Sequence, residues 1–183
     1  MTHMDIAIPD DSFEVAKNMK ATDRFEIAVL GTDPLNACLL PFRARRKNTH
    51  TFTIFNDDNK PIAMWGVLPT KKDKERGCVW FLSDESALSE IRFLRNQKRA
   101  FKWVASHYKF IWNFCTEEQK KTIRWLKYLG FVFNGTVRVV NNVKMLYFYY
   151  EPKKVQIEPI DDLCGPRWAT RMNQKMDNSK NLY

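Results

Sequence analysis

The chain has 183 residues and a formal net charge of +9, with ordinary apolar and charged fractions and a high aromatic content. This length supports one domain with a core of its own and a short appendage. No apolar run reaches the roughly 18 residues that a membrane-spanning helix needs. The segment from Met1 to Pro9 also lacks the pattern of a signal peptide. We therefore expect a soluble protein with no membrane partner.

The cysteines and histidines are scattered along the chain. The four cysteines form no CxxC pair, which favours reduced thiols in a cytosolic protein. The three histidines lie far apart, so the sequence predicts no metal site. These residues are Cys38, Cys78, Cys115, Cys164, His3, His50 and His107.

Helix signals dominate the first forty residues. Asp11-Ser12 and Thr22-Asp23 are suited to cap two short amphipathic helices. Pro34 and Pro41 interrupt the pattern that follows, and a basic connection leads on to Lys47. We expect two helices and then an irregular segment.

Strand signals follow. Two β-branched runs, at 51–55 and 61–67, flank the turn-rich Asn56-Asp57-Asp58-Asn59, which is typical of a hairpin. The short apolar runs at 78–82 and 110–114 are typical of strands buried on both faces. A final hairpin is predicted from 131 to 150, with its turn at Asn141-Asn142.

Two helices are predicted between these strands. The period of apolar residues indicates a helix from Ser86 to Tyr108. A second helix should begin at Thr116, with Gln119 completing a capping box, and should end at Gly130. The predicted class is α/β.

The helix that ends at Gly130 carries the segment Ile123-Arg124-Trp125-Leu126-Lys127-Tyr128-Leu129-Gly130-Phe131. This segment and the order of the elements resemble the GNAT N-acetyltransferase family over roughly Asp11 to Glu151. The resemblance implies a GNAT-like mixed central sheet flanked by helices. It divides the chain into an N-terminal arm (1–10), a GNAT-like domain (11–151) and an extended tail (152–183).

The loop that binds the cofactor in that family differs here. In active members, acetyl-CoA binds where a splayed strand meets a long helix, and a Gly-rich loop lets backbone N–H groups approach the diphosphate. The matching stretch here contains no glycine and places Asp84 and Glu85 between Ser83 and Ser86. Two carboxylates would repel the diphosphate. We therefore expect no cofactor and no measurable acetyl-CoA binding at physiological concentration.

The general acid of the family is also missing. Many members place a tyrosine four residues before the glycine of the Gly-Phe pair, where this chain has Leu126. Tyr128 lies about 200° further round the helix. An asparagine often found seven residues earlier in the family is Gln119 here. The resemblance therefore assigns no catalytic residue.

A narrower resemblance rests on the segments Cys78–Leu82, Ile111–Phe114 and Ile123–Lys127. These segments are similar to the small internal virion proteins of T7-like podoviruses, a GNAT-like phage family. The resemblance implies a structural or accessory protein of the virion, present in the host cytoplasm during assembly. Its partners would be other virion proteins of the portal, core or tail. The C-terminal tail of this chain lies outside the match.

Most of the excess positive charge lies between Leu88 and Tyr128, a stretch with ten basic and three acidic residues. One helical face carries four of the basic residues. A solvated surface, a protein contact and a nucleic-acid or phosphate contact all remain open for it. These residues are Arg92, Arg95, Arg99 and Lys102.

The tail is rich in proline, asparagine and charge, yet it carries apolar residues that can dock on this domain or on a neighbour. The expected docking residues are Ile157, Ile160, Leu163 and Trp168. We expect these residues to dock on a partner protein, so deletion after Pro152 should leave the domain folded and prevent its incorporation into particles. An unfolded truncated domain would show that the tail belongs to its own core.

Three functions are compatible with this sequence. The first is a virion scaffold that has lost acetyl transfer and docks to other virion proteins. The alternative is an acyl-CoA-dependent N-acetyltransferase with a non-standard cofactor loop. A second alternative is a nucleic-acid-binding accessory protein, with DNA as partner.

Overall fold

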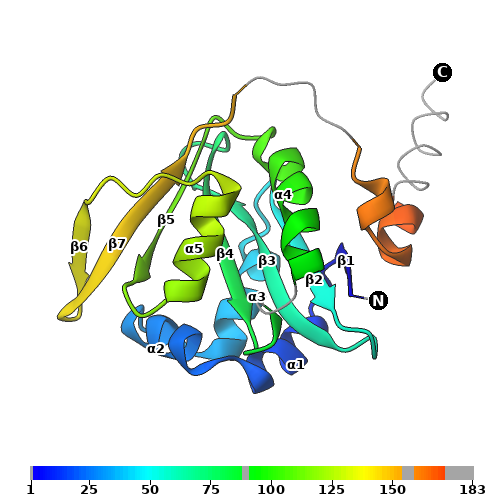
Figure 1. Ribbon diagram of the computed structural model, residues 1–183, viewed down its shortest axis with the longest axis horizontal. Coiled ribbons are helices and arrows are strands. Elements are labelled where there is room, and N and C mark those ends of the chain that lie inside the picture. The colour runs from blue at the N-terminus through cyan, green and yellow to red at the C-terminus, as the bar shows by residue number, and fades with distance from the viewer. Residues whose placement is uncertain (1, 88–90, 154–158, 172–183) are drawn as a thin grey trace.

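A seven-stranded mixed sheet forms the centre of the molecule. The computed structural model describes residues 2–87, 91–153 and 159–171, and only the backbone of 91–96. The strand order is β1-β2-β3-β4-β5-β7-β6, and β4 and β5 form the parallel pair within it (Figure 1). The strands are β1 (His3–Ile6), β2 (His50–Phe55), β3 (Pro61–Pro69), β4 (Arg76–Ser83), β5 (Phe110–Thr116), β6 (Val137–Val140) and β7 (Val143–Tyr150).

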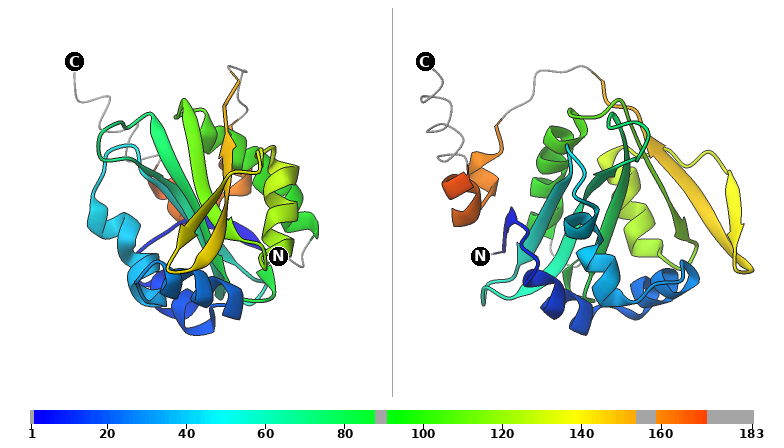
Figure 2. Two further views of the ribbon diagram at one scale, coloured as in Figure 1. Left: turned by 90° about the vertical axis from the view of Figure 1, so that its left-hand side faces the viewer. Right: turned by 180° about the vertical axis from the view of Figure 1, so that it is seen from behind.

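Helices flank this sheet on both faces. On one face, here called the front, α4 and α5 bury their apolar sides in the larger core cluster. On the back face, α1–α3 enclose a smaller cluster with Met64, Trp80 and Leu82 (Figure 2). The helices are α1 (Asp11–Asn18), α2 (Ala21–Val29), α3 (Pro34–Ala44), α4 (Ile91–Ala105) and α5 (Lys120–Leu129), and a 3₁₀ turn, η2 (Asp161–Leu163), follows in the tail. The predicted α/β class, with a mixed sheet flanked by helices, is confirmed.

The turn at Asn141-Asn142 and the helix end at Gly130 are present in the structure as predicted. Asn141 and Asn142 have φ of 47° and 63° in the β6–β7 turn, which matches the left-handed geometry of a tight hairpin. Gly130 ends α5 with φ 105°, and its N–H donates to the Lys127 carbonyl (3.1 Å). In the predicted hairpin from 131 to 150, only 137–150 forms paired strands. Val132 makes an isolated bridge to Tyr149.

The prediction that Pro34 and Pro41 leave an irregular segment is wrong. Both lie in α3, which begins directly after Asp33. The Asp33 carboxylate accepts from the Asn36 N–H (3.0 Å), and Pro34 occupies the first turn, where no backbone N–H is needed. Pro41 and Cys38 are buried. Packing against α1 therefore outweighs the hydrogen bond that Pro41 cannot make.

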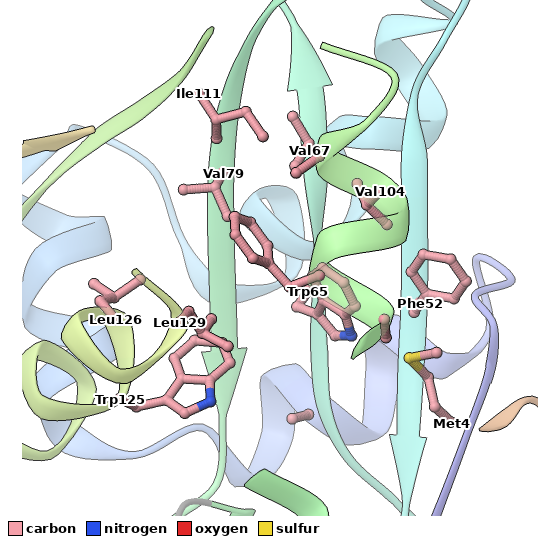
Figure 3. Close-up of a cluster of buried hydrophobic side chains, with 14 of the residues drawn as sticks. Met4, Phe52, Trp65, Val67, Val79, Val104, Ile111, Trp125, Leu126 and Leu129 are labelled. Carbon is pink, nitrogen blue, oxygen red and sulfur yellow. The ribbon is translucent and has the colours of Figure 1, made fainter. Parts of the chain in front are cut away.

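The larger core cluster lies between the sheet and the front helices. Figure 3 shows Trp125 and Leu129 of α5 and Val104 of α4 beside the strands, with Trp65 beneath them. Trp65 is 1% exposed and Val104 is fully buried. At about 1.5–3 kcal/mol for each large buried side chain, this cluster supplies the main driving force for folding.

The N-terminal segment and the C-terminal tail meet at the β1 edge of the sheet. β1 pairs antiparallel with β2, and Cys164 forms a parallel bridge with Met4. The Gly165 N–H donates to the Met4 carbonyl (2.8 Å). A Cβ at Gly165 would lie 2.7 Å from the Asp5 Oδ2, so this close approach requires glycine.

The structure places three of the four expected docking residues on the chain's own domain. Ile160 is fully buried, Trp168 is 7% exposed, and Leu163 packs against the same cluster. Ile157 lies outside the described residues. The expectation that these residues dock on a partner protein is therefore wrong for the three described ones, because they complete the core of their own domain.

Candidate functional site

The two parallel strands at the centre of the sheet separate after a short paired stretch. β4 and β5 pair only at Arg76–Phe110, Gly77–Ile111 and Cys78–Trp112. Beyond this point the Asn113 side-chain amide spans the gap and donates to the Val79 carbonyl (2.6 Å). The strands therefore enclose a wedge, which opens toward Ser83 at the end of β4.

A buried polar cluster closes the mouth of this wedge. The Asp23 carboxylate accepts from the Ser83 N–H (2.9 Å) and from the Gln119 side-chain amide (2.6 Å). The Lys20 ammonium pairs with Asp23 (3.3 Å) and donates to the Thr122 hydroxyl (3.2 Å). All five side chains are buried. The cluster links α2, β4 and α5.

This arrangement corrects two predicted helix caps. Lys20, with no side-chain cap bond, precedes α2, so Asp23 does not act as its cap. α5 begins at Lys120, and the predicted capping box of Thr116 and Gln119 is absent there. Long-range hydrogen bonds across the wedge take these side chains away from local caps.

Inside the mouth, aromatic side chains fill the front of the wedge. The rings of Phe81 and Trp125 lie 4.8 Å apart. The Ser83 hydroxyl is fully buried and has no hydrogen-bond partner among the described residues. The indole N–H of Trp125 also lacks a hydrogen-bond partner among the described residues, and these two unpaired groups suit a polar ligand.

A second carboxylate lies on the back side of the mouth. Glu26 accepts hydrogen bonds from the Thr116 N–H and from the Thr116 hydroxyl (2.8 Å). Burial raises the pKa of Glu26 above its ordinary value, against the opposing effect of these hydrogen bonds. Burial likewise raises the pKa of Asp23, although Lys20 acts in the opposite direction. A carboxylate with a raised pKa is suited to accept a proton near neutral pH.

The loop after β4 holds its own carboxylate in place of an external anion. The Asp84 side chain accepts from the Ser86 N–H (2.9 Å), the Ser86 hydroxyl (2.7 Å) and the Ala87 N–H (3.1 Å). Glu85 is exposed, and Ser83 is the last residue of β4 and not part of the loop. The Ser86 and Ala87 donors of the described part of this loop are therefore already occupied.

The two residues compared with the family's general acid face in opposite directions. Leu126 is buried in the core, whereas Tyr128 is exposed on the outer side of α5. The Lys98 ammonium lies 4.7 Å from the centre of the Tyr128 ring. Tyr128 therefore faces solvent and not the core.

The predicted basic face of α4 is partly used by the tail. Arg99 pairs with Asp162 (2.8 Å) and also donates to the Pro159 carbonyl. Lys102 is exposed. The side chains of Arg92 and Arg95 lie outside the described ones. Sequence reasoning missed that this face fastens the tail, because the partner acid lies 63 residues away.

Nothing in the described part of the chain indicates a metal centre or a membrane span. There, no three His, Cys, Asp or Glu side chains gather as ligands. Among the same residues, no helix is both long and apolar enough to cross a bilayer.

The strand order, the parallel pair and its wedge define the fold of the GNAT acetyltransferases, and solved structures with this fold match the chain. An acetyltransferase of the GNAT family from Streptococcus pneumoniae matches with a TM-score of 0.57 and 12% identity, over 82% of this chain and 99% of that one. The ribosomal-protein-S5-alanine acetyltransferase from Vibrio fischeri gives 0.59 and 15%, over 85% and 95%. The spermidine N-acetyltransferase from Vibrio cholerae, in complex with CoA and spermine, gives 0.58 and 11%, over 82% and 95%.

Sequence comparison adds nothing to this likeness. No family model and no curated protein matches the chain. At identities of 10–15%, the solved structures show the fold alone.

The residues at the wedge fit the amide-containing arm of acetyl-CoA better than its diphosphate. The unpartnered Ser83 hydroxyl and the unpaired stretch of β4 suit the amide-containing arm that carries the acyl group. The loop does not suit the diphosphate, because Asp84 already holds the Ser86 and Ala87 N–H groups. A CoA ester therefore fits this loop only if Asp84 turns away.

A pH-dependent difference is expected for Glu26→Gln. A carboxyl with a raised pKa in the folded state stabilises the fold at low pH and loses that contribution as the pH rises through the folded pKa. Glutamine does not titrate and still accepts the Thr116 hydrogen bonds. The free energy of unfolding of the variant, relative to the wild type, should therefore increase between about pH 4 and 7.

Denaturant unfolding at several pH values measures this difference. Glu117→Gln removes the same charge at an exposed position and serves as the control. A Glu26→Gln curve that stays parallel to the wild type across this range would show that Glu26 does not titrate abnormally.

Proposed function

We propose that this chain is an N-acyltransferase of the GNAT type whose recognition of the donor's diphosphate is weakened. The observation that carries the proposal is the wedge, where β4 and β5 part after three paired residues and a buried, unpartnered hydroxyl lies at the mouth. The structures with the same fold support it, since each is named as an acetyltransferase.

Glu26 is the proposed general base. It lies beside the end of β5 with a raised pKa, on the side of the sheet away from α4 and α5. A base with a pKa closer to neutral is better matched to removing a proton from an ammonium group. The neighbours' names refer to spermidine and to an alanine of a ribosomal protein. We therefore propose a primary amine as the acceptor class.

The experiment tests Asp84 directly. Isothermal titration with acetyl-CoA should give a dissociation constant weaker than about 10 µM for the wild type. Asp84→Asn removes the negative charge from the loop and should tighten binding about tenfold, equivalent to about 1.4 kcal/mol. The Asp84→Asn variant should also release more free CoA thiol than the wild type in the presence of spermidine.

The matched control is Glu85→Gln, which removes the same charge from the exposed neighbouring position. It should change the affinity little, because Glu85 does not occupy the loop donors. If neither the wild type nor Asp84→Asn binds acetyl-CoA or releases thiol, the proposed transferase is wrong.

That negative result would support a second candidate, a GNAT-like domain that has lost acyl transfer. The observation in its favour is the occupied site, in which Asp84 fills the loop and Asp23 closes the wedge. A virion role, with portal, core or tail proteins as partners, rests on the sequence resemblance alone. The comparisons give it no support, so localisation in the virion and host cytoplasm stays a prediction.

A further inference from the structure

One half of the back face carries a row of aromatic residues that belongs to neither core cluster of the described chain. In β5, alternate residues point to the same side of the sheet. Their partners across the β5–β7 ladder, Trp112–Tyr149 and Phe114–Tyr147, share that side. This aromatic row consists of Phe110, Trp112, Phe114, Tyr147 and Tyr149, all half-buried and outside both core clusters.

The row differs from the rest of this face in what covers it. On the same side of β4, Trp80 and Leu82 pack against the cluster beneath α1–α3. From behind, those helices cross the lower part of the sheet, while β7 and β6 extend past them (Figure 2). The strand at 110–114, predicted to be buried on both faces, is therefore only half-buried on this side, where Trp112 lies.

The rings form a continuous series along the two strands. Phe110 stacks on Tyr149, with ring centres 5.6 Å apart and planes 13° from parallel. Tyr149 is followed by Tyr147 at 6.0 Å, and Tyr147 by Phe114 at 5.2 Å. From Phe110 to Phe114 the row extends roughly 13 Å, at about 3.3 Å per strand residue.

An arginine side chain lies over the aromatic ring at each end of the row. The Arg76 guanidinium lies 4.7 Å from the centre of the Phe110 ring, and the Arg138 guanidinium lies 5.6 Å from that of Phe114. Burial raises the pKa of Tyr147, while the charge of Arg76 acts to lower it.

A basic cleft of about 750 Å³ adjoins the Arg76 end. It lies between the end of α3 and the β3–β4 loop, and Glu75, one of its two acidic residues, pairs with Lys109 (2.7 Å). The N–H groups of Lys109 (2.7 Å) and Phe110 (3.3 Å) donate to the carbonyl of Glu75, so the cleft adjoins the start of β5 and the Phe110 end of the row. Its basic residues are Arg46, Lys47, Lys71, Lys72 and Lys74.

We propose that the aromatic row and the basic cleft form a binding surface for single-stranded nucleic acid. Bases can stack on aromatic side chains without sequence preference, while neighbouring cations track the phosphates. A duplex hides its base faces in its own stack, which is why the single strand is the fitting ligand. The net charge of +9 favours association with a polyanion. This surface is separate from the basic face of α4, because α4 lies on the front of the sheet.

Fluorescence anisotropy with a labelled oligothymidylate tests the proposal on the full chain. The wild type should bind the single strand at low salt and prefer it to a duplex of the same length. Arg76→Gln/Arg138→Gln should weaken binding and reduce the slope of log K against log salt by about 1.4, or about 0.7 for each lost contact. Tyr147→Ser should weaken binding about fivefold to hundredfold through lost stacking.

The matched control is Lys102→Gln/Arg124→Gln, which removes two exposed charges from the front helices. It should retain most of the affinity. Circular dichroism checks that Tyr147→Ser stays folded, and the arginine variants alter no buried side chain. The proposal is overturned if the wild type does not bind at low salt, if the duplex binds as well, or if only the control variant loses affinity. A wild-type dimer that Tyr147→Ser converts to a monomer would also overturn it, because a second copy would then cover the row.

Discussion

Trp168→Ala is expected to lower the free energy of unfolding by about 3–5 kcal/mol, the usual cost of truncating a buried aromatic residue. The side chain is 7% exposed and packs with Trp103 and Phe52, at ring distances of 5.2 and 6.2 Å. Its indole N–H donates to the Asp161 carboxylate (2.7 Å). Loss of the ring therefore leaves both a cavity and an unpaired acceptor.

Equilibrium unfolding in urea, followed by circular dichroism, measures the change. Phe25→Ala is the matched control, because Phe25 is 47% exposed and its loss should cost less than about 0.5 kcal/mol. Equal losses in the two variants would show that Trp168 contributes no more than a surface residue and that the tail does not close the core.

The same packing bears on truncation after Pro152. Such a deletion also removes Ile160, which is fully buried in the larger core cluster. Native domains are stable by only about 5–15 kcal/mol, so losing both side chains brings the truncated chain close to unfolding. We therefore expect a destabilised domain in place of the folded one that a partner-docking tail would leave.

Asp5→Ala is expected to cost about 3–5 kcal/mol by releasing the tail from the sheet. Asp5 is 3% exposed, and its carboxylate accepts from the N–H groups of Ile6 (2.8 Å), Arg167 (2.9 Å) and Trp168 (2.8 Å). A buried donor left without its acceptor costs about 1–3 kcal/mol, and bonds to a charged group are the stronger ones.

Asp10→Ala is the control for this variant, since Asp10 carries the same charge nearby, is exposed and makes no side-chain cap bond to α1. Hydrogen exchange at the Trp168 amide gives a second measurement. Asp5→Ala should accelerate it far more than Asp10→Ala does. Unchanged exchange and stability in Asp5→Ala would show that the Asp5 carboxylate does not hold the tail.

The elements that depend on near neighbours in the chain could be predicted from the sequence. The hairpin of β2 and β3, the αL end of α5 at Gly130 and the Asn141-Asn142 turn are each fixed by a few adjacent residues. The absence of glycine after β4 predicted a loop that differs from the one that binds the cofactor in the family. It did not reveal that Asp84 turns back to accept from Ser86 and Ala87.

Only the tertiary structure decided how polar side chains are used across the molecule. Asp23 and Gln119 have the local pattern of helix caps, yet they bond to each other across the mouth of the wedge, 96 residues apart in the chain. Several hydrogen-bond donors stabilise a buried carboxylate more than the single hydrogen bond of an exposed helix cap would. Two of the donors to Asp23 lie in distant segments of the chain. Sequence periodicity carries no information about such distant partners.

The tail and the aromatic row show the same limit of prediction from sequence. Apolar residues in the tail indicated that it docks, but the site of docking depended on Asp5 and Met4 at the other end of the chain. The alternation in β5 likewise places Phe110, Trp112 and Phe114 on one face. Whether helices cover that face depends on where α1–α3 end, because burial is a property of the assembled layers and not of a strand's own pattern.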